Sequence, residues 1–403
     1  MSAKLDYVTT AIVYPNNRIH VGFAWECLGA DWLVRSKRLL GRPTYFATGM
    51  DEHSINVQKA AEAQSLSPKA YCDRMSEDIQ RVLRGIGMSY DRFIRTSDED
   101  HERVVQKLVQ RAFDKGDIYK AKYEGLYCES CEAFYTEKDL IGGNCPSHPR
   151  PPKFISEENY FFKLSKYQDA LLKLFKDQPN FLQPEGRRSE ITNFIAGGLK
   201  DFSVSRSTFT WGVPLPWDPS HVVYVWFDAL INYLTAAGIE GWLDDPNGPK
   251  GATFRERWPA DVHIIGKDIS RFHTIYWPAM LMSLDLPLPR AVFAHGWMSL
   301  KGERMSKSTG NMVTPDEVVA ATGVDPFRYY LLAENQFAGD GNFALDLLML
   351  KSNADLANDM GNLVNRSISM TRKYFPERAL AAPTAVTHSA PLLDIGLDFE
   401  IGQ

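Results

Sequence analysis

The chain has 403 residues, a net charge of −5, and a composition of 44% hydrophobic and 24% charged residues. This balance is that of an ordinary globular protein, and it excludes a disordered or collagen-like chain. At about 150 residues per domain, the length predicts two or three domains. The longest apolar stretches, such as 222–231, are shorter than the ~20 residues of a membrane span, and the N-terminus has no signal pattern. We therefore expect a cytoplasmic protein without a membrane partner.

Strand-like and helix-like segments alternate at the beginning of the chain. Residues 7–14 (YVTTAIVY) are rich in β-branched and aromatic side chains and predict a buried strand. An amphipathic helix is expected over 24–40, stopping at Gly41, and a second strand over 43–48. A strand, a helix and a strand in this order form the βαβ unit of a doubly wound parallel sheet. The fold class is therefore predicted to be α/β, with a Rossmann-type domain.

Later segments repeat this α/β pattern after an interruption. Residues 54–115 are mostly helical in pattern, whereas cysteines, prolines and short aromatic runs set 117–220 apart as an insertion. Strands are then expected over 222–227, 262–265 and 291–294, and helices across 325–375.

Two short motifs within the insertion predict a metal site. Cys128-x-x-Cys131 and Cys145-x-x-His148, with thirteen residues between the pairs, supply four ligands of the types that tetrahedral zinc prefers. Four protein ligands leave no position open for water, so the zinc is expected to be structural. Free cysteines or a redox pair are the alternative for this set.

Two further segments are suited to phosphate binding, although each is weak by itself. His20 and Gly22 lie where the first strand turns into the first helix, and a glycine there lets a phosphate approach the backbone. Residues 302–311 (GERMSKSTGN) place Arg304 and Lys307 in a loop bracketed by glycines. A helix-capping histidine and a solvated surface turn are the alternatives.

Together the two segments resemble the HIGH and KMSKS signatures of class I aminoacyl-tRNA synthetases, and other segments narrow the resemblance to the methionyl-tRNA synthetase family. These segments are 51–53 (DEH), 125–140 (GLYCESCEAFYTEKDL), 159–167 (NYFFKLSKY), 202–206 (FSVSR), 211–216 (WGVPLP), 224–234 (YVWFDALINYL), 265–273 (IGKDISRFH), 276–280 (YWPAM), 304–311 (RMSKSTGN) and 325–332 (DPFRYYLL). The resemblance implies an ATP-dependent ligase that activates methionine as methionyl-adenylate, with Mg²⁺ accompanying ATP, and esterifies the 3′ end of tRNA.

The resemblance also implies roles for particular residues. His20 and Lys307, with Arg304 as a second cation, would stabilise the reacting phosphate. Further ATP contacts would come from Gly22, Phe23, Gly266, Asp268 and Ser308, and the amino-acid site would consist of Ile12, Tyr14, Asp51, Trp226, Ile269, Phe272 and His273. Asp51 would hold the amino group, and the aromatic residues would surround the thioether.

The resemblance divides the chain into six segments. These are the first half of the Rossmann-type catalytic domain (1–116), the connective insertion with the zinc knuckle (117–220), the second half (221–296), the region of the KMSKS loop and stem contacts (297–348), the start of a helical anticodon-type domain (349–376) and an Ala/Pro-rich tail (377–403).

Some departures from the family pattern leave alternatives open. Phe23 replaces the second signature histidine and cannot donate a hydrogen bond to a phosphate. Because the tail cannot form an anticodon-binding surface, we expect adenylate formation with poor charging of tRNA. One alternative is a related ligase that loads an amino acid onto a small hydroxylated amine in a hydrazine-forming pathway, alone or with a fused or separate partner domain. The other is a non-catalytic binding protein with this fold.

Overall fold

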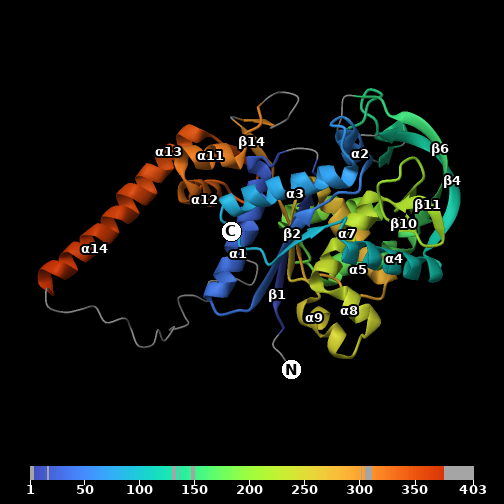
Figure 1. The fold of residues 1–403 in the computed structure, drawn as a ribbon, viewed down its shortest axis with the longest axis horizontal. Helices are drawn as coiled ribbons and strands as arrows, with labels where there is room; N and C mark the ends of the chain where they lie inside the picture. Colours follow the sequence, from blue (N-terminus) through green and yellow to red (C-terminus); the bar gives the residue numbers. More distant parts are fainter. Residues whose placement is uncertain are drawn as a thin grey trace. The chain divides into compact units, whose positions relative to one another are not determined.

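The computed structural model describes residues 4–15, 18–128, 133–135, 137–146, 150–300, 302–304 and 311–375 (Figure 1). Its chain divides into two compact units. The first unit comprises Met1–Ile19, Ala30–Arg84 and Met88–Ala294, and the second comprises His20–Gly29, Gly85–Gly87 and His295–Gln403. No helix among the described residues is long and apolar enough to cross a membrane.

A six-stranded sheet organises the first unit. Its strand order is β3 (Arg92–Arg95), β2 (Thr44–Met50), β1 (Asp6–Val13), β12 (Val262–Gly266), β13 (Val292–His295) and β7 (Leu182–Gln183). The β3–β2, β2–β1, β1–β12 and β13–β7 ladders are parallel. Central strands of a parallel sheet are covered on both faces, and all of β12 is accordingly buried. The predicted doubly wound α/β fold is confirmed.

Helices connect these strands and supply much of the core. They are α1 (Val21–Leu39), which has residues in both units, α2 (Ile55–Glu62), α3 (Pro68–Gly85), α4 (Glu99–Asp114), α5 (Gln168–Asp177), α6 (Glu185–Ala196), α7 (Val225–Ala237), α8 (Ile239–Asp244), α9 (Ala252–Arg257) and α10 (Trp277–Ser283). Short 3₁₀ turns span Glu137–Asp139, Leu164–Tyr167, Pro249–Gly251 and Lys267–Ile269, and a π-helical turn spans Phe272–Tyr276. Helix α7 is buried at nearly every position, so its apolar residues contribute to one large hydrophobic cluster.

Two small sheets also belong to the first unit. One has the order β5 (Ala133–Tyr135), β4 (Ile118–Cys128), β6 (Lys153–Phe162) and β8 (Phe202–Ser203), and its ladders are antiparallel. The other joins β10 (Pro214–Leu215), β11 (Asp218–Val223) and β9 (Ser205–Arg206).

The second unit combines a small sheet with helices. The sheet order is β15 (Glu303–Arg304), β14 (Met298–Leu300) and β16 (Gly341–Phe343). The helices are α11 (Pro315–Thr322), α12 (Val324–Ala333), α13 (Leu345–Lys351), a π-helical segment (Ser352–Met360) and α14 (Gly361–Tyr374). The Glu317 side chain accepts a hydrogen bond from the Thr314 backbone N–H at 3.3 Å, which satisfies one N–H at the start of α11.

The structure corrects the secondary structure predicted in three places. Of the strand expected over 222–227, only Val222 and Val223 lie in a strand, because β11 ends at Val223 and α7 begins at Val225. The prediction is wrong for the remaining residues. A helix buried all round presents apolar residues continuously, as a buried strand does, so periodicity cannot separate the two. The short strands β3 and β16 also interrupt segments expected to be helical.

Candidate active site

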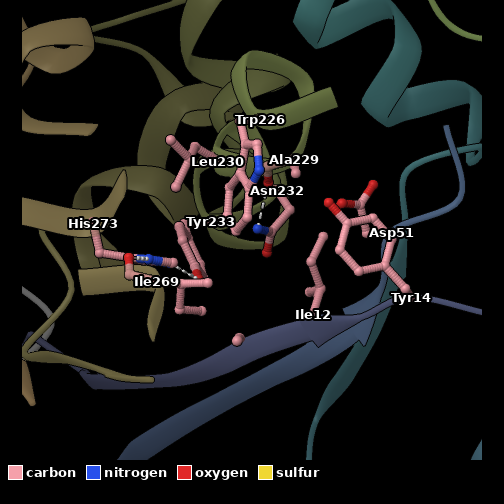
Figure 2. A pocket seen from close by; sticks show the side chains of 11 residues that line it. Ile12, Tyr14, Asp51, Trp226, Ala229, Leu230, Asn232, Tyr233, Ile269 and His273 are labelled. Atoms are coloured by element: carbon pink, nitrogen blue, oxygen red, sulfur yellow. Dashed lines mark hydrogen bonds between the residues drawn. The ribbon is translucent and has the colours of Figure 1, made fainter. Parts of the chain in front are cut away.

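One pocket in the first unit lies beside the carboxyl ends of β1, β2 and β12 (Figure 2). Crevices at this edge are where open α/β sheets bind ligands. The residues that line it are Ala11, Ile12, Tyr14, Asp51, Trp226, Ala229, Leu230, Asn232, Tyr233, Ile269 and His273.

Helix α7 provides the largest wall of the pocket. Ala229, Leu230 and Tyr233 lie three, four and seven residues after Trp226, so the four side chains share one face of α7. Behind this wall, the Trp226 ring stacks on Phe272 with 3.8 Å between centroids and 5° between planes. These four residues make the wall mainly aromatic and apolar, with Asn232 of the same helix as its polar member, and a second aromatic ring supports it.

His273 lies at one end of the pocket as a neutral imidazole (Figure 2). Burial lowers the pKa of His273 to about 4. Its Nδ1 lies 3.1 Å from the Ile269 carbonyl oxygen, which can only accept, so Nδ1 donates. Nε2 consequently accepts a hydrogen bond from the Tyr233 hydroxyl at 2.8 Å. This end of the pocket carries no charge at neutral pH and suits an uncharged group.

A carboxylate lies toward the other end of the pocket. Asp51 directly follows β2, is 2% exposed, and donates its backbone N–H to the Val13 carbonyl at 2.9 Å. Figure 2 shows its side chain near that of Tyr14, away from His273. The pocket thus combines an apolar wall with one acidic group, which is the arrangement that an amino acid with an apolar side chain requires.

The structure places six of the seven expected amino-acid-site residues on this pocket: Ile12, Tyr14, Asp51, Trp226, Ile269 and His273. Of the seven, Phe272 contacts the pocket through Trp226 rather than lining it. Sequence analysis missed five lining residues, which are Ala11, Ala229, Leu230, Asn232 and Tyr233. Helical spacing from Trp226 identifies three of them, Ala229, Leu230 and Tyr233, but the predicted strand over 222–227 conceals this relationship.

The turn before α1 lies in the second unit and holds His20 in one tautomer. The Gly22 backbone N–H donates to His20 Nδ1 at 3.0 Å, so the proton of the neutral ring resides on Nε2. A Cβ at position 22 would come within 2.9 Å of the imidazole, which explains the glycine. Phe23 follows on α1 and is half-buried.

The remaining expected nucleotide contacts are spread over both units. In the first unit, buried Gly266 ends β12, and exposed Asp268 follows in the next turn. In the second unit, the backbone of Arg304 ends β15. Lys307 and Ser308 lie outside the described residues.

Two of the four predicted zinc ligands are described. Cys128 is the last residue of β4 and is 5% exposed, and Cys145 is 4% exposed. Their thiols are the soft ligands that zinc binds, and their burial fits a structural site. Cys131 and His148 lie outside the described residues, and among the residues that are described no group of three potential ligands occurs. The zinc site remains a prediction.

Comparison with known proteins places the chain in a family. The family model for "tRNA synthetases class I (M)" matches residues 6–151 and 138–368. The methionine–tRNA ligase of Caldanaerobacter subterraneus subsp. tengcongensis is 50% identical over 372 residues, covering 92% of this chain and 57% of that protein. The methionine–tRNA ligase of Clostridium acetobutylicum is 49% identical over 373 residues, with coverages of 92% and 57%.

A solved structure agrees with these relatives. Mycobacterium tuberculosis methionyl-tRNA synthetase, in complex with methionyl-adenylate, matches with a TM-score of 0.87 and 45% identity, over 93% of this chain and 73% of that chain. The present chain spans little more than half the length of the two curated relatives. The family match covers most of the sequence, and the chain therefore belongs to the methionyl family of class I tRNA synthetases.

Proposed function

We propose that this chain activates methionine with ATP and transfers the methionyl group to the 3′ end of tRNA. The observation that carries the proposal is the pocket, which is lined by an aromatic wall on α7, a neutral His273 and the carboxylate of Asp51. A thioether is apolar and polarisable and packs favourably against aromatic rings. The structure of the M. tuberculosis relative, solved in complex with methionyl-adenylate, supports the same choice of substrate.

In the proposed reaction, a carboxylate oxygen of methionine attacks the α-phosphorus of ATP. A new P–O bond forms, the bond from that phosphorus to the bridging oxygen breaks, and pyrophosphate leaves with the electron pair. Asp51 holds the ammonium group, so the carboxylate is presented in a fixed orientation. Mg²⁺ bound to ATP would neutralise part of the phosphate charge.

The nucleotide roles rest on the family resemblance. We assign the Nε2–H of His20 and the cation of Lys307 to the α-phosphate, where negative charge grows as pyrophosphate leaves. Arg304, Ser308, Gly22 and Phe23 are assigned to the ATP phosphates and base, and Gly266 and Asp268 to the nucleoside. The zinc ion, held by Cys128, Cys131, Cys145 and His148, would stabilise the insertion. We place the reaction in the cytoplasm.

Methionine-dependent ATP–pyrophosphate exchange tests the activation step. We expect the unmodified chain to catalyse exchange and Lys307→Ala to lower its rate at least about a hundredfold, because a cation on the reacting phosphate is lost. Lys173→Ala is the control, since this lysine side chain is 74% exposed on the surface helix α5. Near-normal exchange by Lys307→Ala would contradict the assignment.

The identity of the acceptor is tested separately. The same preparation is supplied with initiator and elongator methionine tRNAs, or with hydroxylated lysine, and the esterified product is measured. Charging of either tRNA supports the proposal, as the names of the relatives suggest, and the rate of charging relative to adenylate formation tests the expectation of poor charging. If only hydroxylated lysine is loaded, the acceptor is a small molecule and the proposed transfer to tRNA is wrong.

A further inference from the structure

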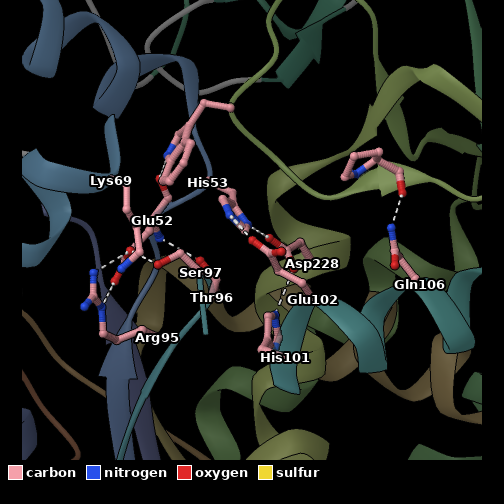
Figure 3. A network of polar contacts seen from close by, with 12 residues as sticks. Glu52, His53, Lys69, Arg95, Thr96, Ser97, His101, Glu102, Gln106 and Asp228 are labelled. Atoms are coloured by element: carbon pink, nitrogen blue, oxygen red, sulfur yellow. Dashed lines mark hydrogen bonds and ion pairs between the residues drawn. The ribbon is translucent and has the colours of Figure 1, made fainter. Parts of the chain in front are cut away.

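A buried carboxylate beside the pocket joins two histidines (Figure 3). Asp228 Oδ2 lies 2.7 Å from His53 Nδ1, and its Oδ1 lies 2.9 Å from His101 Nε2. Asp228 and His101 are 0% exposed, and His53 is 2% exposed. We call these three residues the carboxylate clamp.

The carboxylate of the clamp is ionised. Although burial alone would raise the pKa of Asp228, the charges and hydrogen bonds of His53 and His101 lower it to about 2. An ionised carboxylate only accepts hydrogen bonds, so each imidazole donates one N–H to it. Charge-assisted hydrogen bonds in a dry interior are strong and fix the geometry of both partners.

The clamp links the acidic end of the pocket to its apolar wall on α7. His53 belongs to the loop 51–54 after β2, two residues beyond Asp51, whereas Asp228 lies on α7 between Trp226 and Leu230 of the pocket wall. His101 holds the same carboxylate from α4. We propose that Asp228 is a positioning residue that, through His53, sets the distance between the Asp51 carboxylate and the α7 wall. This inference rests on the proposed function, in which Asp51 binds the ammonium group.

Other contacts hold the loop to different neighbours. The Asp51 N–H donates to Val13, the Glu52 N–H donates to Thr96 Oγ1 at 2.8 Å, and Trp211 Nε1 donates to the Glu52 carbonyl at 2.6 Å. These anchors remain when the Asp228 carboxylate is removed. Loss of the clamp should therefore shift Asp51 relative to α7 without unfolding the loop.

The first experiment measures methionine-dependent pyrophosphate exchange by Asp228→Asn in the full chain. We expect the KM for methionine to rise about tenfold and the KM for ATP to stay within about twofold, because a small misplacement of a binding group is costly. His53→Ala removes the imidazole that donates to Asp228 and should give the same selective rise. Unchanged KM values for methionine in both variants would overturn the proposal.

A substrate analogue separates an effect on Asp51 from an effect on the wall. 4-(Methylthio)butanoate keeps the thioether and the carboxylate but has no ammonium group. As a competitive inhibitor it should have the same Ki with Asp228→Asn and with the unmodified chain. A Ki that rises as much as the KM for methionine would mean that Asp228 only supports the apolar wall, which contradicts the proposal.

Two further variants test whether the effect on the KM for methionine is specific to Asp228 and acts through Asp51. Asp117 is also 0% exposed, and it accepts hydrogen bonds from Lys166, Tyr167 and Ser283 without lining the pocket. Asp117→Asn therefore controls for the loss of a buried carboxylate and should leave the KM for methionine unchanged. Adding Asp228→Asn to Asp51→Asn should produce little further loss, whereas additive losses would overturn the proposed coupling.

Failure of the proposed function is distinguishable from failure of the clamp. An unmodified chain that shows no methionine-dependent exchange contradicts the proposed function alone. The clamp is then tested by the pKa of His53, measured by NMR in the unmodified chain and in Asp228→Asn. A lower pKa in the variant supports the clamp, and an unchanged pKa overturns it.

Discussion

Trp226 and Phe272 lie in parallel, with 3.8 Å between their ring centroids, although they come from segments of the chain that are far apart in sequence. Trp226 belongs to the first turn of α7, and Phe272 opens the π-helical turn Phe272–Tyr276. The stack fixes the plane that the indole presents to the pocket. Recognition of an apolar side chain therefore depends on a residue behind the wall.

Phe272→Ala should weaken this recognition. An aromatic pair contributes about 0.5–1.5 kcal/mol beyond its buried area, so loss of the stack should raise the KM for methionine about 2- to 10-fold in the exchange assay. Phe154→Ala, at a phenylalanine that is 68% exposed on β6, should leave the KM unchanged. An unaltered KM in Phe272→Ala would show that Trp226 needs no support.

Gly22→Ala should disturb His20 rather than the fold. The added Cβ would lie 2.9 Å from the imidazole, so the ring must rotate away from its hydrogen bond with the Gly22 N–H. We expect kcat of exchange to fall about tenfold. Gly85→Ala is the matched control, because a Cβ there meets nothing within 4 Å at the end of α3. Equal kcat values for the two variants would contradict the role of His20.

The sequence pattern predicted the start of the fold well and the middle poorly. Residues 7–14 and 24–40 were recognised because a buried strand and an amphipathic helix have distinct periods, and they correspond to β1 and α1. The run 222–227 is deceptive because α7 is buried on all sides and begins with consecutive apolar residues. Burial in the folded protein stabilises the helix in this segment, and the periodicity of the local sequence does not reveal that burial.

Local sequence pattern was equally limited in predicting the residues of the site. Resemblance to the family supplied Asp51, Trp226 and His273, whose placement on one pocket the structure shows. The carboxylate clamp was not predicted, because Asp228, His53 and His101 come from three separate elements and neither spacing nor charge links them along the chain. Contacts between distant segments need the fold before they can be seen.

The clamp should make stability depend on pH. Burial would lower the pKa of His53, but the charge and hydrogen bond of Asp228, followed by Glu102 and Glu52, raise it above the ordinary value of 6.5. His101 shares the Asp228 carboxylate. A pKa raised by folding contributes stability below the ordinary value, and this contribution is lost as pH rises through the folded pKa.

Urea denaturation of Asp228→Asn measures this contribution. Relative to the unmodified chain, we expect a loss of about 3 kcal/mol in unfolding free energy at about pH 5.5 and a smaller loss at about pH 8. Asp244→Asn, at a half-exposed carboxylate paired with Lys107, should show little loss at either pH. Equal losses at both pH values in Asp228→Asn would mean that His53 does not gain its charge there.

Metal analysis tests the zinc prediction. We expect about one zinc per chain by elemental analysis, and Cys145→Ser should lose the metal and lower the melting temperature. Cys72→Ser is the control, since this thiol is buried in α3, apart from the two predicted ligand pairs. Full zinc occupancy in Cys145→Ser would remove Cys145 from the ligand set.

The amino-acid specificity of pyrophosphate exchange tests the central claim most directly. The unmodified chain is assayed with each of the twenty amino acids, and kcat/KM is compared. The aromatic wall, the neutral His273 and Asp51 predict that methionine is preferred over every other amino acid by at least about tenfold. Preference for another amino acid, or exchange that no amino acid stimulates, would contradict the account.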